Sequence, residues 1–207
     1  SESIINNLIL LGWSPNKKKE TIEIDEILQL YKFENLSKSS SIFSYEKLNF
    51  FNNHFIQEDK NYNKLLEYCK NNLVLRNYIK TDREKFFKIF SIYKKNIYFY
   101  KKLENICLNY FDINFSTTKH KLLTVEFNVL INEFSKILND IEKWNVEILE
   151  KEIKKFITKK GIKFILFGKP MRLLLINSEN GPSVSNILFI LSKKSSIKRI
   201  KNYITSN

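Results

Sequence analysis

Residues 144–161 read W-N-V-E-I-L-E-K-E-I-K-K-F-I-T-K-K-G, and this stretch carries the signals of a complete α-helix. Asn145 is a good N-cap, because its side-chain oxygen can accept a hydrogen bond from a free N–H group of the first turn. Acidic residues come early and lysines come late, which is the order that the helix dipole favours. Gly161 is typical of the residue that ends a helix. The stretch therefore predicts a helix over 146–160.

The same periodicity extends over most of the chain. Apolar residues recur three or four positions apart at 4–11, 24–31, 45–55, 65–75, 86–110, 123–141 and, as two short helices, 187–204. A capping box at Thr81–Glu84 is expected to open the helical run at 86–110. With only four glycines and three prolines in 207 residues, the chain lacks the turn residues that an all-β protein needs. We therefore predict an all-α fold.

Polar residues at 112–118 interrupt this periodicity and mark a boundary. We expect a small helical module at 1–60, followed by a helical bundle in two parts, 61–115 and 116–207. The chain does not begin with Met, and residue 4 already belongs to an apolar helical pattern, so we expect it to be a piece of a longer protein.

The net charge of +13 favours a nucleic-acid partner, because lysine and arginine gain free energy when they displace counterions from phosphates. The chain is also rich in Lys, Asn, Ile, Phe and Tyr, the residues of AT-rich codons, and this bias explains some of the lysines. Those of the 146–160 helix are interpreted as a solvated face that also attracts RNA without specificity.

Several function classes find no support in the sequence. No apolar run approaches the eighteen or so residues that span a bilayer, so no membrane partner is expected. Cys69 and Cys107 have no His or Cys neighbour at ligand spacing, and we interpret them as buried thiols. The histidines, His54 and His120, belong to no nucleotide-binding motif, and there is no glycine-rich loop. We predict no catalytic residue, no metal ligand and no cofactor in this chain.

Four short motifs follow one another along the chain. They are L-L-G-W-S-P at Leu10–Pro15, L-S-K-S at Leu36–Ser39, F-N-N-H-F-I at Phe51–Ile56, and K-P-M-R at Lys169–Arg172 with Gly181-Pro182 after it. In this order and spacing, the chain resembles the C-terminal, tRNA-binding portion of bacterial-type glutamyl-tRNA synthetases over essentially its whole length. That family usually has Trp at the start of the third motif, where this chain has Phe50 and Phe51.

The L-S-K-S motif also looks like the end of the K-M-S-K-S loop that holds ATP in class I synthetases. Asn35 stands where the first lysine of that loop would be, and in the family the ATP loop lies upstream of the L-L-G-W segment. The resemblance implies instead that Lys38, Asn53 and His54 contact the tRNA stem. An ordinary exposed lysine is the alternative for Lys38.

The resemblance also implies that Arg172 reads an anticodon base and that Gly181, Pro182 and Val184 touch the anticodon. The chemistry agrees, because unpaired bases offer edges to a guanidinium fork and faces to flat apolar groups. We expect a turn at Gly181-Pro182, a helix from about Ser183 and an apolar platform at Val184. The alternative for Arg172 is an arginine that extends from an apolar segment into water.

Discriminating members of the family carry an arginine that selects the third anticodon letter. The matching position here is Asn96, or Lys95 if the alignment shifts by one residue. Asparagine has no charged bidentate fork, so selectivity between tRNA(Glu) and tRNA(Gln) is expected to be relaxed.

The resemblance thus implies the tRNA-binding and anticodon-recognition part of a glutamate–tRNA ligase, with a stem-contact module at 1–60 and two anticodon-binding subdomains after it. The whole enzyme would attach glutamate to tRNA(Glu) with ATP and Mg²⁺, as a monomer in the cytoplasm or in an organellar matrix. Two alternatives remain open from the residues. They are a stand-alone basic helical RNA-binding module without enzymatic activity, and a helical scaffold with no RNA role.

Overall fold

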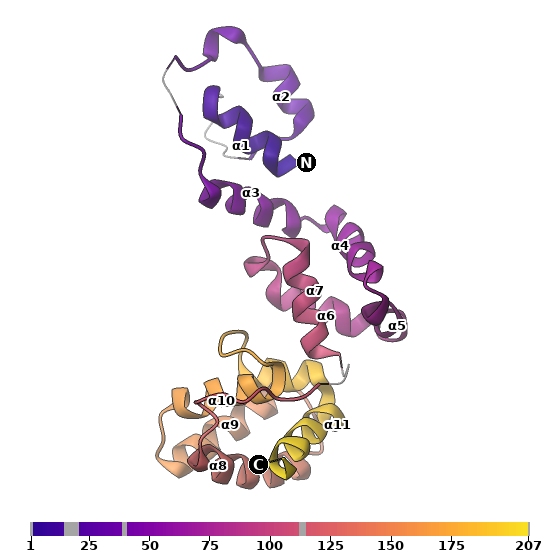
Figure 1. Ribbon diagram of the computed structural model, residues 1–207, viewed down its shortest axis with the longest axis vertical. Coiled ribbons are helices and arrows are strands. Elements are labelled where there is room, and N and C mark those ends of the chain that lie inside the picture. The colour runs from indigo at the N-terminus through magenta and orange to yellow at the C-terminus, as the bar shows by residue number, and fades with distance from the viewer. Residues whose placement is uncertain (1, 15–20, 39–40, 112–114, 207) are drawn as a thin grey trace. The chain divides into compact units, whose positions relative to one another are not determined.

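The computed structural model describes residues 2–14, 21–38, 41–111 and 115–206, and these residues are predominantly helical (Figure 1). The one β contact among them is an isolated bridge between Trp13 and Leu36. The predicted all-α fold is confirmed. Parts of two sequence motifs, at Pro15 and Ser39, lie outside the described residues.

The chain divides into two compact units, Ser1–Asn72 with Tyr93–Glu104, and Leu73–Ile92 with Asn105–Asn207. The first unit contains α1 (Glu2–Gly12), α2 (Ile24–Leu30), the 3₁₀ helix η1 (Phe33–Asn35), α3 (Tyr45–Gln57), α4 (Asp59–Asn71) and the 3₁₀ helix η2 (Lys94–Asn96). The second unit contains α5 (Leu73–Thr81), most of α6 (Arg83–Tyr93), α8 (Val125–Asp140), α9 (Val146–Lys160), α10 (Phe164–Ile176) and α11 (Val184–Thr205), and α7 (Tyr100–Tyr110) has residues in both units. The expected division at 60 and 115 stays a prediction.

The first unit is held together partly by a buried asparagine. Asn6 is 1% exposed, its Oδ1 accepts a hydrogen bond from the Ile22 N–H at 2.8 Å, and its Nδ2 donates to the Ile22 carbonyl at 2.9 Å. This paired contact fixes α1 to the segment that leads into α2, where Trp13 and Ile27 join Ile22 in a small apolar core. A buried amide is stable here because both of its polar ends have partners.

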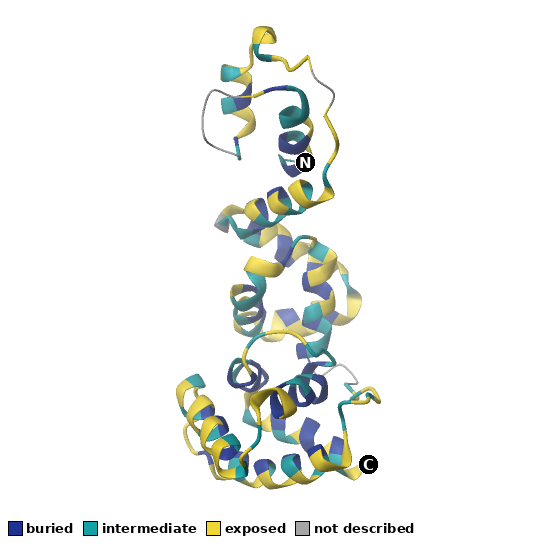
Figure 2. Ribbon diagram, turned by 90° about the vertical axis from the view of Figure 1, so that its left-hand side faces the viewer, coloured by how far each residue is buried: buried dark blue, intermediate teal, exposed yellow. Residues whose placement is uncertain are grey.

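The core of the second unit is aromatic. Phe134 packs on Phe156 and Phe167, each with 5.1 Å between ring centroids, and Phe127 lies 6.3 Å from Phe167. These residues come from α8, α9 and α10, so the helical stripe predicted at 123–141 faces this core. In Figure 2 the helices of this unit show buried residues on one side and exposed residues on the other.

The helix at 146–160 forms as its sequence predicts. The Asn145 Oδ1 accepts a hydrogen bond from the Ile148 N–H at 2.9 Å, and Gly161 has φ 63°, a left-handed conformation that favours glycine. Both ends of α9 are therefore set by local chemistry.

The start of α6 differs from the prediction by one residue. Thr81 is the last residue of α5, and its hydroxyl donates to the Asn77 carbonyl at 2.9 Å. Asp82 instead accepts a hydrogen bond from the Lys85 N–H at 2.9 Å. The predicted capping role of Thr81 is wrong, because the hydroxyl is already engaged in the preceding helix.

Ser192 divides the last helical segment into the two helices that the sequence predicts. Its backbone has φ 71° and ψ 161°, which no helical residue adopts. Just before the break, the Leu188 carbonyl accepts hydrogen bonds from the Trp144 indole N–H at 3.1 Å and from the Ser196 hydroxyl at 3.4 Å.

Lysine 193, directly after this break, caps a neighbouring helix. Its ammonium donates to the carbonyl of Asn139 at 2.8 Å and to that of Ile141 at 2.7 Å. The last carbonyls of a helix have no partner within it and carry the negative end of its dipole. Lys193 therefore stabilises the C-terminal end of α8.

Arg199 likewise stabilises the C-terminal ends of two other helices. It is only 3% exposed, and its guanidinium donates to the carbonyls of Asn109 at 2.7 Å, Tyr110 at 3.4 Å and Leu175. These carbonyls stand at the C-terminal ends of α7 and α10. The Phe115 ring covers the guanidinium, with 3.7 Å between its centroid and the Arg199 Cζ.

Cys69 and Cys107 are both buried, as predicted, and neither forms a disulfide bond. None of the described helices combines the length and the apolar character needed to cross a lipid bilayer.

Candidate nucleic-acid interface

Helix α10 carries Arg172, the residue that the sequence singles out most strongly. The helix begins at Phe164, before Pro170, and so extends beyond the apolar run from Leu173 to Ile176 that was expected to anchor it. Those four residues are indeed buried. Arg172 itself is half-buried, between the core-facing side of α10 and solvent.

The segment after α10 forms the turn that the sequence predicts. Asn177 ends the helix in a left-handed conformation, φ 51°, and Gly181 has φ 154°, which side-chain-bearing residues rarely adopt. Ser183 then caps α11, because its hydroxyl accepts a hydrogen bond from the Asn186 N–H at 3.2 Å. The start of α11 at Val184 is confirmed.

Arg172 and this turn lie together. The Arg172 Nε donates a hydrogen bond to the Pro182 carbonyl at 2.8 Å. The guanidinium makes no other hydrogen bond or ion pair with the described residues. One donor therefore fixes the orientation of the fork, and the terminal nitrogens keep their hydrogen-bonding capacity for a ligand.

A second contact fixes the start of the turn. The Asn177 Nδ2 donates to the Ser116 carbonyl at 3.0 Å, and its Oδ1 accepts from the Thr118 N–H at 3.1 Å. The residues before α8 are thereby fastened to the end of α10.

An ion-pair group holds the middle of the turn. The Glu179 carboxylate lies 3.2 Å from the His120 Nε2 and 3.6 Å from the Lys169 Nζ. Arg172, Asn177 and Glu179 thus hold the turn at three points. Its backbone is therefore ordered before any ligand binds.

The three turn residues expected to touch RNA differ in accessibility. Gly181 is exposed and Pro182 is half-buried, but Val184 is only 1% exposed. The apolar platform expected at Val184 is therefore not present. As the first residue of α11, Val184 packs inward, so its side chain offers no flat surface to a base.

Asn96 and Lys95 lie in η2 of the first unit, and both are exposed. The Asn96 carbonyl accepts a hydrogen bond from the Lys102 ammonium at 2.6 Å, which orients the backbone at this position. Arg172 belongs to the other unit.

Asn53 is engaged within the protein. Its Nδ2 donates to the carbonyls of Lys94 at 2.9 Å and Ile97 at 2.8 Å, and its Oδ1 accepts from the Gln57 Nε2 at 2.6 Å. Both amide hydrogens are used, so Asn53 fastens η2 to α3 and supports the turn that carries Lys95 and Asn96.

Lys38 and His54 are accessible. Lys38 is exposed and follows the short extended segment in which the Ser37 N–H donates to the Gly12 carbonyl at 2.7 Å. The His54 side chain is 45% exposed, and its Nε2 lies 3.9 Å from the Glu58 carboxylate. Either side chain can meet a phosphate without a rearrangement of the fold.

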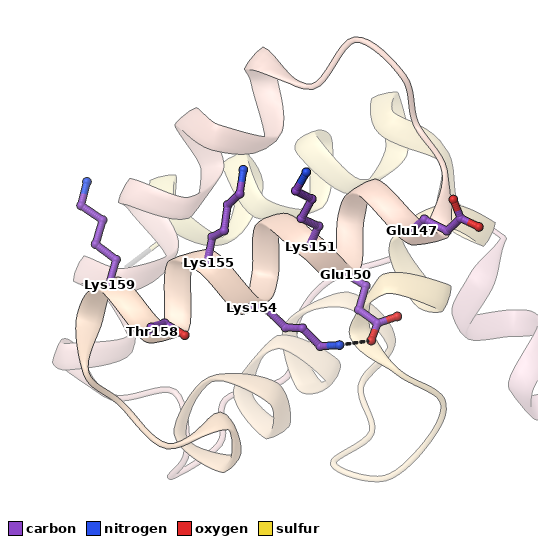
Figure 3. Close-up of a pocket in the computed structure, with 7 residues that line it drawn as sticks. All are labelled: Glu147, Glu150, Lys151, Lys154, Lys155, Thr158 and Lys159. Carbon is purple, nitrogen blue, oxygen red and sulfur yellow. Dashed lines mark ion pairs between the residues drawn. The ribbon is translucent and has the colours of Figure 1, made fainter.

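The lysine face of α9 is exposed at Lys151, Lys154, Lys155 and Lys159, as predicted, whereas Lys160 is half-buried and pairs with Glu133. Figure 3 shows Lys151, Lys155 and Lys159 pointing to the same side of the helix, while Lys154 turns to Glu150. The Lys154–Glu150 ion pair measures 2.7 Å. All the residues around this hollow belong to one helix, so it is an exposed face rather than an enclosed site.

Across the described ranges, no three His, Cys, Asp or Glu side chains come close enough together to hold a metal ion.

The sequence arguments missed one residue beside Arg172. Phe164 is 46% exposed at the beginning of α10, and the Arg172 Cζ lies 5.9 Å from the centroid of its ring. The spacing of Phe164, Gly168 and Arg172, four residues each, places all three along one side of a helix and would have been the signal.

Comparisons with known proteins show the family of this chain. A family model described as an anticodon binding domain matches residues 54–204. The glutamate–tRNA ligase of Parabacteroides distasonis is 29% identical over 206 residues, which is 98% of this chain and 40% of that protein. Glutamate–tRNA ligase 2 of Helicobacter acinonychis is 31% identical over 211 residues, with 98% of this chain and 44% of that protein covered.

Solved structures give the same result. The crystal structure of a glutamate tRNA ligase from Elizabethkingia meningosepticum superimposes with a TM-score of 0.82 and 26% sequence identity, covering 99% of this chain and 41% of that one. The chain spans about 40% of the length of the curated relatives named here.

Proposed function

Because this chain belongs to the anticodon-binding domain family, we propose that it is the part of a glutamate–tRNA ligase that binds tRNA and recognises its anticodon. The observation that carries this proposal is the Arg172 guanidinium, which is fixed by the Pro182 carbonyl and keeps its terminal nitrogens available. The names of relatives that cover 98% of the chain support the ligase assignment over a stand-alone RNA-binding module.

Arg172 reads the edge of an unpaired base in this proposal. Bases of a single-stranded loop are unstacked and expose their hydrogen-bonding edges. A guanidinium can donate two parallel hydrogen bonds to such an edge, and one such pair discriminates against a wrong base by about 1–3 kcal/mol. The hydrogen bond to Pro182 reduces the entropy that Arg172 loses on binding, because the fork is already oriented.

The turn contributes backbone contacts beside Arg172. Gly181 is exposed, and the absence of a side chain lets RNA approach its peptide groups closely. Pro182 presents part of its ring next to them. Val184 supports this surface from below.

The first unit provides the remaining contacts. Asn96, or its neighbour Lys95, meets the third anticodon letter, and Asn53 holds their turn in place. Lys38 and His54 contact the tRNA stem. The absence of an arginine fork at Asn96 makes tRNA(Gln) a second partner besides tRNA(Glu).

Bond formation is assigned to the rest of the whole ligase. The complete protein attaches glutamate to tRNA with ATP and Mg²⁺, whereas this chain contributes binding free energy and positions the tRNA. We propose that the protein is a monomer in the cytoplasm. An organellar matrix is the alternative compartment.

The test is the binding of an anticodon stem-loop of tRNA(Glu), measured by fluorescence anisotropy at fixed salt. Arg172→Ala should weaken binding by about 1–3 kcal/mol, the loss expected for one bidentate base contact. Lys151→Ala on the α9 face is the control, and it should weaken cognate and unrelated hairpins alike by a small factor. Equal effects of the two substitutions, or the same affinity for a hairpin with an unrelated loop, would refute anticodon recognition by Arg172.

A further inference from the structure

A residue that neither the sequence motifs nor the family resemblance assigns completes the surface around Arg172. We infer that Phe164 is the stacking platform for the unpaired base whose edge Arg172 binds. The inference rests on the proposed function and goes beyond it, because it names the group that meets the face of the base.

Phe164 has the exposure and position that stacking requires. Its side chain is 46% exposed, although phenylalanine in this unit is otherwise largely a core residue, as Phe127, Phe134 and Phe167 are. Its ring lies 5.9 Å from the Arg172 Cζ, so the ring and the guanidinium form one continuous surface. An exposed aromatic face next to an oriented cationic fork is the combination that binds an unpaired base by face and edge together.

Gly168 sets the position of this ring. It lies one helical turn after Phe164, and a Cβ built there would be 2.5 Å from the Phe164 Cε1 and 2.8 Å from its Cζ. Such contacts are far below van der Waals distance, so the ring occupies the space that a side chain at 168 would fill. The missing side chain lets the ring lie against the helix toward Arg172 instead of standing away from it.

The charge around this surface suits RNA. The Lys169 side chain, on the same helix, is 37% exposed, and the Glu179 carboxylate of the following turn lies 3.6 Å from the Lys169 Nζ and 3.2 Å from the His120 Nε2. With Val184 buried, Phe164 is the aromatic side chain in contact with Arg172 that remains available to stack a base.

The first test compares two exposed apolar residues of α10. Phe164→Ala should weaken binding of the anticodon stem-loop about 5- to 150-fold, the range for loss of one stacked base. Leu166→Ala is the matched control, because Leu166 is 60% exposed but lies about 200° around the helix from Phe164. It should leave affinity within twofold. Phe164→Tyr should keep the affinity of the wild-type chain, because tyrosine retains the aromatic ring.

The second test separates stacking from helix stability. Gly168→Ala should raise helix propensity and leave the melting temperature equal or higher, yet weaken RNA binding as Phe164→Ala does. A fold defect would lower both quantities together. Unchanged affinity for Gly168→Ala would show that the ring does not act from this position and would overturn the inference.

A stem-loop that carries 2-aminopurine at each loop position in turn gives a direct readout. One position should lose fluorescence on binding to the wild-type chain and regain it with Phe164→Ala. If the stem-loop does not bind the wild-type chain, the proposed function fails. If it binds and Arg172→Ala weakens it, but Phe164→Ala behaves like Leu166→Ala, only the stacking inference fails.

Discussion

Arg172 and Arg199 belong to the same unit, and each places a guanidinium against a backbone carbonyl and a phenylalanine ring. The Arg199 Cζ lies 3.7 Å from the centroid of Phe115, and the Arg172 Cζ lies 5.9 Å from that of Phe164. Arg199 is 3% exposed, and its donors are directed to the ends of two helices. Arg172 is half-buried and commits only Nε to the protein.

The difference lies in how many donors each arginine has left. A buried cation is stable only if its donors have partners, and the carbonyl dipoles at helix C-termini are such partners. A cation at a rim needs one contact to fix its direction, and its remaining donors then serve a ligand. The same chemistry therefore supports the fold at Arg199 and, at Arg172, leaves donors for the recognition proposed above.

The largest expected effect is that of Arg199→Met on stability. The carbonyls of Asn109, Tyr110 and Leu175 lose a shared donor, and each buried unpaired acceptor costs about 1–3 kcal/mol. We expect the free energy of unfolding to fall by about 3 kcal/mol or more, measured by urea denaturation. Arg172→Met, the matched control, should cost less than about 1 kcal/mol. Equal losses would show that the two arginines do not differ as described.

The next effect concerns Arg172→Lys, which keeps the charge and removes the fork. Affinity for the anticodon stem-loop should fall by about 1–3 kcal/mol, because lysine cannot donate a bidentate pair. Isothermal titration calorimetry with the stem-loop measures this loss of affinity. Arg83→Lys, at an exposed position of α6, should leave affinity unchanged. If Arg172→Lys also leaves it unchanged, Arg172 acts only as a charge.

Asn177→Gly tests whether the two arginine sites are coupled, because Asn177 lies between the Leu175 carbonyl that Arg199 binds and the turn that Arg172 binds at Pro182. Glycine tolerates the φ of 51° but loses the hydrogen bonds to Ser116 and Thr118, so the free energy of unfolding should fall by about 1 kcal/mol. Stem-loop affinity should fall less than it does for Arg172→Lys, because the hydrogen bond from Arg172 to Pro182 still holds the turn. A loss as large as that of Arg172→Lys would mean that the contact at Asn177 controls recognition. Asn177→Ala should be less stable than Asn177→Gly by a further 1 kcal/mol or so.

The smallest effect is a pH dependence of stability that arises from Glu104. Burial pushes the pKa of Glu104 upward, but hydrogen bonds from Asn72 and Lys101 outweigh it and hold that pKa below its ordinary value. A lowered folded-state pKa gives stability that is complete above the unfolded pKa, about 4.3, and is lost as the pH falls through the folded value.

Urea unfolding between pH 7 and pH 3 measures this contribution. The stability difference between the wild-type chain and Glu104→Gln should shrink toward acid pH. A constant difference for Glu104→Gln would contradict the assigned cause.

Local chemistry was enough to predict much of the fold. Asn145, Gly161 and Ser183 act at helix ends through contacts within a few residues, so their roles follow from the sequence alone. Helix α10 was not predicted as a helix, because Gly168 and Pro170 interrupt it and it is apolar on most sides. Only burial against α8 and α11 explains why it forms.

The candidate site, too, could be predicted only where local residue types identify it. Arg172 and the turn were found because their residue types are unusual and close in sequence. Arg199 was missed, since in the run K-R-I-K it looks like one more exposed cation of a lysine-rich chain. The sequence placed the apolar platform at Val184, but whether the first side chain of a helix is buried depends on packing that a sequence does not show. In the structure Val184 is buried and Phe164 is exposed.

The break at Ser192 has a consequence for how the molecule opens. A hydrogen-bond ladder cannot run through a residue with φ 71° and ψ 161°, so the two segments of α11 fray independently. In amide hydrogen exchange, the segment that follows the turn should open without loss of protection around Arg199. The first segment of α11 can therefore open while the Arg199 hydrogen bonds to the ends of α7 and α10 stay intact.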